Sequence, residues 1–584
     1  MGFNGFFDAI GSEWDWDLGY NYGRTYDTTQ DTGYTDVSRL ASQLDSPGVL
    51  PCNGPAQSAP GATGTWQEIN GQYYQILLPG CVPVNPFGGY NSVTGESAIT
   101  PAMVAYNQAV EQFITAVTMR DYTADITGQL AQLPAGPLSV AVGGEALEQD
   151  GFVSPGNLLQ RCETTLRCIQ PTAGRTWTHA EYFELEIPLL TDVPFAQSLS
   201  IDLANRWSQF TWQGGTQGTP DAGVKKGDHA TTGRAQIRWQ PTQDLLLRAS
   251  WAQGFRAPSI NDLYNAGGAS YNTLQDPCAP AAENGGWVAG TPLPSGCGGV
   301  VHVQNGAQIQ RLVGGNPGLT PERSISRSAG FVYSPNWLPG FNFGADYYNI
   351  DVGNNIGTVP AQYILDQCYI DNNSQYCNLI TLAGGNTITL IKNIDVNVGE
   401  EYTNGVDVNA SYSLPETSVG QFRISTNWTF VRSFVGIVPD VKSPTGFQAF
   451  EDAGYPQIPK RRGTVALNWD MGNWSANWNI TYIGKVYESC SANTIQLNEC
   501  SQPNSFDENT QTMGENELGT TIYHDAAVTY HVDPINTDFT FGIQNLFNKQ
   551  FPVAHTVSFP ANFESEMGYR IPGRFFYARV GVKF

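Results

Sequence analysis

Alternation of apolar and polar residues with a period of two is the feature that most constrains this sequence. The segment 574–584 places apolar side chains at every second position, namely Phe576, Ala578, Val580, Val582 and Phe584. The other face carries Arg579, Gly581 and Lys583. Because successive side chains of a strand point to opposite faces, this segment predicts a strand between an apolar medium and water.

The same pattern recurs along the whole chain, for example in residues 234–239, 422–430 and 474–482. The pattern recurs in segments of about 10 to 13 residues, a length that suits a strand crossing a lipid bilayer. We expect about 16 such strands. They begin near Glu13, Arg120, Leu138, His179, Gln197, Thr231, Asp244, Ser324, Gly340, Val396, Gly420, Arg461, Asn473, Thr521, Asn536 and Arg574.

The composition indicates one large β-structured domain whose strands contact an apolar medium. Charged residues make up only 14% of the 584 residues, whereas glycine (63 residues) and aromatic residues (12%) are abundant. No run approaches the 18 or more apolar residues of a membrane helix. The predicted fold class is therefore all-β, a transmembrane antiparallel β-barrel.

The connections between the expected strands alternate between short and long. Short ones are 133–137, 241–243, 470–472 and 532–535, and long ones are 24–119, 150–178, 211–230, 254–323, 353–395, 435–460, 485–520 and 548–573. Short turns on the periplasmic rim and long loops on the extracellular rim are typical of outer-membrane barrels. Within the long loops we expect helices at Thr100–Phe113, with Thr100 as N-cap, and at Pro360–Leu365.

All ten cysteines fall in the long connections, two in each of five loops. This distribution predicts five local disulfides in an oxidising compartment: Cys52 with Cys81, Cys162 with Cys168, Cys278 with Cys297, Cys368 with Cys377, and Cys490 with Cys500. Metal binding is the competing interpretation. It is disfavoured because the sequence has no Cys-x-x-Cys motif and its six histidines are scattered.

The sequence contains no motif that indicates an enzyme or a cofactor site. It lacks a Gly-x-Ser-x-Gly elbow, a His-Glu-x-x-His motif, a phosphate-binding glycine loop and a dinucleotide fingerprint. Carboxylate pairs such as Asp15 with Asp17 are expected to be lumen or rim charges. The net charge of -24 excludes an electrostatic grip on nucleic acid, and it fits either soluble loops or attraction of cationic ligands.

Four segments resemble motifs of the TonB-dependent receptor family and occur in the family's order. They are 254–264 (GFRAPSINDLY), 315–324 (GNPGLTPERS), 403–408 (TNGVDV) and 544–549 (QNLFNK), and the chain also ends in Phe584. The residues that carry the resemblance are Gly254, Phe255, Arg256, Ala257, Pro258, Asn316, Pro317, Pro321, Glu322, Asn545, Leu546, Phe547 and Phe584. We interpret them as structural in preference to ligand contacts.

The resemblance implies an outer-membrane protein of a Gram-negative bacterium that imports a scarce solute with energy delivered by TonB. Outer-membrane lipid, TonB and a siderophore, vitamin or carbohydrate would be its partners. Family barrels have about 22 strands, preceded by a signal peptide, a TonB-contacting box and a plug. The signal peptide, the TonB-contacting box and the plug are not visible in this sequence, and only about 16 strands are expected. Residues 1–584 are therefore expected to be an amino-terminally truncated barrel domain that does not work without its plug.

Two other classes of protein remain open. A complete 16-stranded porin would be a passive channel, for which the expected strand count suffices unaided. A soluble extracellular β-rich binding or adhesive protein is the third possibility. The solute itself cannot be read from the sequence, since loop tryptophans can either stack on a ligand or pack their own loops; these are Trp66, Trp177, Trp212 and Trp287.

Overall fold

A computed structural model gives the arrangement of most of the chain. It describes residues 1–47, 49–55, 57–60, 63, 65–69, 72–84, 99–164, 168–215, 226–265, 267–281, 286–304, 308–439, 447–455, 457–487, 505–507, 512–514, 517–552, 568–570 and 573–582.

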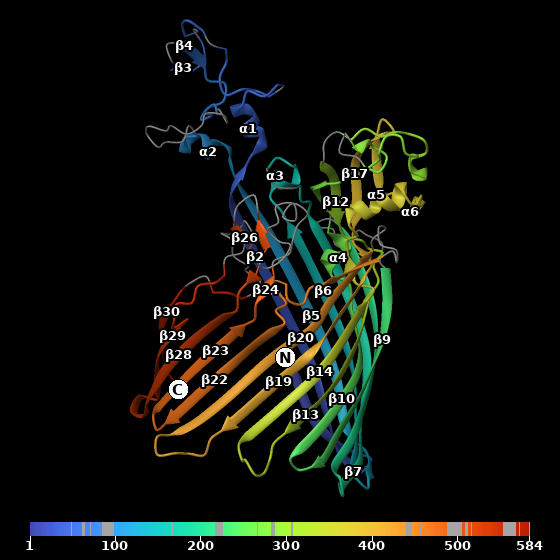
Figure 1. Cartoon of the computed structure of the whole chain (residues 1–584), viewed down its shortest axis with the longest axis vertical. Helices are drawn as coiled ribbons and strands as arrows, with labels where there is room; N and C mark the ends of the chain where they lie inside the picture. Colours follow the sequence, from blue (N-terminus) through green and yellow to red (C-terminus); the bar gives the residue numbers. More distant parts are fainter. Residues whose placement is uncertain are drawn as a thin grey trace.

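One sheet of 18 strands forms a strongly curved wall (Figure 1). Every neighbouring pair in it is antiparallel. Its strands are β1 (Gly2–Ala9), β2 (Ser12–Thr35), β5 (Gln108–Leu133), β6 (Gly136–Ser154), β7 (Thr172–Val193), β8 (Ala196–Gly215), β9 (Lys226–Thr242), β10 (Leu245–Arg256), β13 (Glu322–Tyr333), β14 (Phe341–Gly353), β19 (Glu400–Ser413), β20 (Gln421–Pro439), β21 (Phe447–Glu451), β22 (Arg461–Met471), β23 (Trp474–Ile483), β28 (Thr521–Val532), β29 (Thr537–Gln544) and β30 (Phe575–Val582).

The expected all-β antiparallel architecture is confirmed, and all 16 anticipated strands lie in this sheet. The two further strands are β1 and β21. Sequence analysis missed β1 because Phe6 and Phe7 are adjacent and so fall on opposite faces, which breaks the alternation. A two-residue turn joins β1 to β2, with Ile10 and Gly11 at φ 54° and 77°, the combination that suits a tight hairpin. β21 lies inside the loop expected at 435–460.

Several strands are much longer than expected. β2 has 24 residues and β5 has 26, so the connection expected at 24–119 is mostly strand at both ends. The helix predicted at Thr100–Phe113 begins as expected but ends at Asn107, where the chain enters β5. The upper end of β2 is polar and rich in threonine, and it pairs with the upper end of β5. Apolar alternation therefore does not predict this part of the strand pair.

The outward face of the wall is an apolar band. Side chains that stand opposite one another across β6, β7, β8, β9 and β10 include Val140, Leu185, Leu203, Ala235 and Trp251. Leu203 and Trp251 are 39% and 40% exposed on this face. This face therefore suits contact with lipid.

The inward face is polar and carries ion pairs between strands. Arg234 of β9 donates to Glu184 of β7 and to Asp202 of β8, each at 2.7 Å from Nη2. Arg248 of β10 binds Asp346 of β14 through two hydrogen bonds. Such a charged face requires a lumen that is filled with water.

Charges reappear on the outward face above the apolar band. Arg120 of β5 and Arg175 of β7 both contact Glu148 and Asp150 of β6. Because charged side chains avoid the hydrocarbon layer, this cluster is expected to lie above it. β5 starts at Gln108, so about 12 residues precede Arg120, and at ~3.3 Å per residue they project about 40 Å further.

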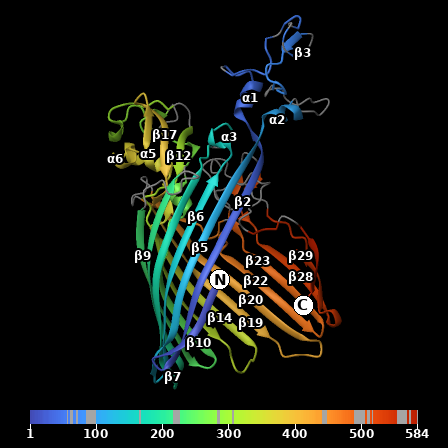
Figure 2. The same cartoon turned by 180° about the vertical axis from the view of Figure 1, so that it is seen from behind.

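The two rims differ as expected. The anticipated short turns at 133–137, 241–243, 470–472 and 532–535 all join neighbouring strands at the lower edge in Figure 1. The opposite edge carries the α-helices and the small strands (Figures 1 and 2). None of the helices in the described part of the chain is long and apolar enough to cross a membrane.

The helices and small strands are short. The helical segments are α1 (Val37–Gln43), α2 (Pro101–Asn107), α3 (Asn157–Gln160), α4 (Ile260–Tyr264), η2 (Ser295–Cys297), α5 (Ala361–Tyr369), α6 (Ser374–Cys377) and η3 (Asp533–Ile535). The strands outside the wall are β3 (Trp66–Ile69), β4 (Gln72–Gln75), β11 (Gly268–Thr273), β12 (Gln308–Gly314), β15 (Ile356–Gly357), β16 (Ile380–Ala383), β17 (Thr387–Ile394), β18 (Val396–Asn397), β24 (Val486–Tyr487), β25 (Ser505–Asp507), β26 (Thr512–Gly514) and β27 (Glu517–Leu518).

The wall has two lateral edges. β1 pairs with β2 and β30 pairs with β29, and among the described residues β1 and β30 do not pair with each other. Each edge strand thus presents unpaired backbone groups, which cost several kcal/mol apiece in lipid.

The lipid-facing band predicts how the wall tolerates charge. Leu203→Arg places a cation in the middle of the band and is expected to lower the free energy of unfolding by about 2–4 kcal/mol. Thr123→Arg is the matched control, because Thr123 faces the lumen opposite Glu145. Guanidinium unfolding in lipid vesicles measures both, and an equal cost for the two variants would contradict the assigned faces.

Candidate functional site

Two of the long loops fold together into one lobe above the wall. We define the paired-loop lobe as the described residues of 268–314 and 356–397, which follow β10 and β14 respectively. Its sheet has the order β11-β12-β17-β16, and the parallel pair β12–β17 joins the two loops. The lobe occupies the upper right of Figure 1.

The lobe has its own hydrophobic core. Ile309, Ile364, Leu365 and Ile391 are at most 4% exposed and pack together from both loops. The disulfides Cys278–Cys297 and Cys368–Cys377 belong to the same core. The predicted helix at Pro360–Leu365 is present as α5, which begins after Pro360 and runs on to Tyr369. The lobe is therefore a folded unit and presents a defined surface.

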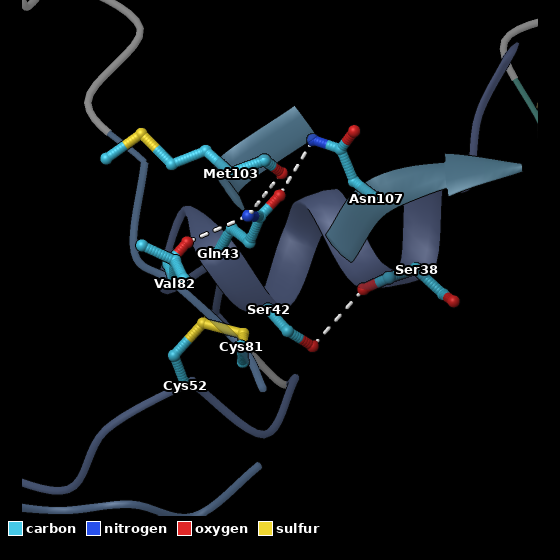
Figure 3. Close-up of a disulfide and its surroundings, with 8 residues drawn as sticks. All are labelled: Ser38, Ser42, Gln43, Cys52, Cys81, Val82, Met103 and Asn107. Atoms are coloured by element: carbon cyan, nitrogen blue, oxygen red, sulfur yellow. Dashed lines mark hydrogen bonds between the residues drawn. A yellow bond between two sulfur atoms is a disulfide. The ribbon is translucent and has the colours of Figure 1, made fainter. Parts of the chain in front are cut away.

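Four of the five predicted disulfides are present. Besides the two in the lobe, Cys162 is bonded to Cys168 and Cys52 to Cys81. Figure 3 shows the last of these beside α1, where the amide of Gln43 donates to the carbonyls of Val82 and Met103. Cys490 and Cys500 lie outside the described residues.

One group in the described chain resembles a metal site, namely Asp276, Cys278 and His302. The Sγ atom of Cys278 is bonded to Cys297, so it is no thiolate ligand. Nδ1 of His302 lies 2.8 Å from Oδ2 of Asp276, and both side chains are buried. The pair instead supports the lobe, because Asp276 also accepts from the Cys278 backbone N–H at 2.9 Å.

Arg256 connects the first two family-like motifs. Its guanidinium donates to both carboxylate oxygens of Glu322, at 2.6 and 2.7 Å, and to Asp262 at 2.8 Å. Glu322 also accepts from the backbone N–H of Ile356 at 2.7 Å. One arginine thereby ties the end of β10, the start of β13 and the start of the second loop of the lobe. A bidentate arginine–carboxylate pair fixes geometry in a way that a lysine cannot.

The second motif forms the seam between the two loops. Asn316 donates to the backbone carbonyl of Asp395 at 2.9 Å, and Asn354 donates to the carbonyl of Pro321 at 3.0 Å. Leu319 is 2% exposed. The carbonyl of Pro317 accepts from the indole N–H of Trp212 at 3.2 Å, which fastens this seam to β8.

Helix α4 packs closely on the inward face of the wall. A Cβ added to Gly214 of β8 would lie 2.3 Å from the ring of Tyr264, and one added to Gly174 of β7 would lie 2.8 Å from it. The ring fits only because these positions lack side chains. The Tyr264 hydroxyl is buried without a hydrogen-bond partner, and burial raises the pKa of Tyr264 to about 12.

Beside α4 lies a pocket of about 400 Å³ between the wall and the segment that follows Arg256. The motif residues Ala257 and Pro258 line one side of it. Inward side chains of β5, β6, β7 and β8 form the other, including Val117, Phe210 and Trp212. Phe210 also packs against the motif residue Phe255, with ring centres 4.9 Å apart.

The remaining motif residues have structural surroundings. Gly254 leaves room for Ser324, whose Oγ would lie 2.6 Å from an added Cβ. Asn545 is buried at φ 51° and exchanges two hydrogen bonds with the backbone of Lys549. Leu546 donates to the carbonyl of His524, and the Phe547 ring contacts the His524 ring. Phe584 lies outside the described residues.

Sequence analysis missed the pocket, because its wall comes from strand ends that were assigned to loops. Trp177 and Trp212 were considered as loop aromatics, yet they lie in β7 and β8 and both line the pocket. Trp66 lies in β3, and the indole N–H of Trp287 donates within its own loop to Thr291. The sequence signal for their location in strands was that each tryptophan lies in a segment where polar and apolar residues alternate.

The Arg256 network predicts a local change in hydrogen exchange. Arg256→Gln leaves Glu322, which is 7% exposed, without its cation, so the Ile356 amide is expected to exchange at least tenfold faster. Arg327→Gln is the control, since Arg327 and Asp351 form an exposed pair on the next strands. Mass spectrometry measures exchange over residues 354–360. An equal response to both variants would refute the role of Arg256 in holding Glu322 against the Ile356 amide.

The family model described as "TonB dependent receptor-like, beta-barrel" matches residues 2–546. The pyoverdine outer membrane receptor FpvA of Pseudomonas aeruginosa PAO1 is 11% identical, with a TM-score of 0.52 over 100% of this chain and 60% of that one. The ferric-catecholate import receptor Fiu of E. coli K12 is 11% identical, with a TM-score of 0.49 over 98% of this chain.

This chain spans 64% of the length of Fiu. A search of curated proteins finds no match. The solved structures share too little sequence to indicate more than the fold. The family model covers most of the chain, and it does so in the region where the strands, the lobe and the motif network lie. The chain therefore belongs to the TonB-dependent receptor family, as part of its β-barrel.

Proposed function

We propose that this chain is the barrel of a receptor that imports a scarce solute across the outer membrane of a Gram-negative bacterium. The observation that carries the proposal is the family match over residues 2–546. The paired-loop lobe and the pocket on the long-loop rim support this proposal, because a solute that enters from that side would meet them first. We propose a siderophore, a vitamin or a carbohydrate as the class of solute.

The proposed location rests on the two faces of the wall. An apolar outward face and an ion-paired inward face suit a protein with lipid outside and water inside. Disulfides on the long-loop rim suit exposure to an oxidising exterior. The long-loop rim would then be extracellular and the short turns periplasmic.

We propose further strands and a plug as the missing parts of the working receptor. The unpaired edges of β1 and β30 support this, because a wall in lipid needs partners for both. The plug would gate the lumen and contact TonB, which delivers the energy. On this proposal residues 1–584 alone bind a solute at the mouth but do not transport it.

A passive porin is not favoured. It would require the wall to close on itself, whereas β1 and β30 do not pair among the described residues, and the matching family is one of receptors. A soluble adhesive protein is disfavoured by the apolar outward face, which would be exposed to water.

Uptake by intact cells tests the proposal. Cells that lack the gene are expected to import at least one labelled solute, tested as ferric siderophore, cobalamin and oligosaccharide, at least tenfold more slowly at low concentration. The advantage of cells that carry the gene should vanish when TonB is inactivated. Uptake that depends on the gene but persists without TonB would identify a passive channel and overturn the proposal.

A further inference from the structure

The pocket beside α4 differs from the rest of the inward face in its chemistry. None of its 18 lining residues is charged. Elsewhere the inward face pairs carboxylates with arginines, as in Glu184, Asp202 and Arg234. The chain as a whole carries a net charge of -24, so an uncharged hollow of about 400 Å³ is a specific feature of this part of the wall.

The walls of the pocket are apolar with hydroxyl groups at intervals. Phe210, Trp212, Val117, Val153 and Ile260 supply apolar surface. Phe210 and Trp212 are each 4% exposed, so both rings are fixed in place. The hydroxyl-bearing residues around them are Thr115, Thr172, Thr176, Thr178, Thr211 and Ser259. Rigid apolar walls with a few polar groups are typical of sites for small organic ligands.

Three charged residues close to the pocket in sequence are paired with other side chains, namely Arg256, Glu148 and Asp150. Arg256, next to the lining segment, is bound to Glu322 and Asp262. Glu148 and Asp150 stand beside Gln149 on the outward face of β6, where they pair with arginines. A charged ligand group that entered the pocket would lose water without gaining a counter-ion, which costs several kcal/mol.

We propose that this pocket binds a neutral, mainly apolar group of the solute, best fitted by an aromatic ring with a hydroxyl substituent. The ring packs among the apolar lining residues, and the threonine hydroxyls orient the substituent. The volume of about 400 Å³ lies within the range of small-ligand sites. The assignment to solute recognition rests on the proposed uptake function, whereas the binding chemistry belongs to the pocket itself.

Three probes with one ring and different charges test the proposal. The full chain in lipid nanodiscs is titrated with para-fluorobenzyl alcohol, para-fluorobenzoate and para-fluorobenzylammonium, and fluorine NMR line broadening reports binding. The neutral alcohol is expected to bind at least tenfold more tightly than either ion. Equal affinity for the three probes would overturn the proposal.

Substitutions locate the binding. Val117→Trp fills the pocket and is expected to weaken binding of the alcohol at least tenfold. Val110→Trp is the matched control on β5, because Val110 is 49% exposed and lies outside the lining. Val153→Trp from β6 provides a second filling variant if Val117→Trp fails to fold. Binding of the alcohol that survives a folded filling variant would place the site elsewhere and overturn the proposal.

Gln149→Glu tests the charge rule from inside the pocket. The added carboxylate is expected to weaken binding of the alcohol and to strengthen binding of the ammonium probe, each at least fivefold. An unchanged order of affinities would contradict the proposed chemistry. Normal uptake by cells that lack the gene, combined with pocket-dependent binding of the alcohol, would overturn the uptake proposal alone.

Discussion

The hydrogen-bond ladder of the wall is the constraint on which the rest of the structure depends. A strand in lipid must satisfy its backbone N–H and C=O groups with neighbouring strands, because no water is available to do so. That requirement fixes the register, and the register decides which side chains face outward. Leu203 and Trp251 thus share a row on the lipid side, while Asp202 and Arg234 meet on the other. Among the described residues, β1 and β30 each have one edge whose backbone groups no neighbouring strand pairs.

The long strands carry this ladder beyond the lipid and so build the mouth. β5 continues past Arg120, and β6, β7 and β8 continue beside it. Their inward side chains meet α4 above the membrane, where Gly174 and Gly214 let the helix approach. Arg256 and Glu322 then fasten α4 to the lobe. The pocket is the space left between the wall and the segment that leads from Arg256 into α4.

Period-two alternation predicted most of the wall, because a lipid-facing strand must repeat its apolar residue at every second position. It failed for β1, where Phe6 and Phe7 are adjacent, and for the paired upper ends of β2 and β5, because that end of β2 is polar and rich in threonine. The cysteine pairs were predictable since each pair lies within one loop. The lobe was not, because its parallel β12–β17 pair joins two loops that are far apart in sequence. The pocket depends on register and could not be predicted from either segment alone.

The central claim is that the two rims of this wall lie on opposite sides of a membrane. Epitope tags inserted at Gly290 in the lobe and at Ala135 in a short turn test it most directly, with antibody labelling of intact cells of the native host. The account predicts labelling of the Gly290 tag in intact cells and of the Ala135 tag only after the outer membrane is permeabilised. Labelling of both tags in intact cells, or of the Ala135 tag alone, would contradict it.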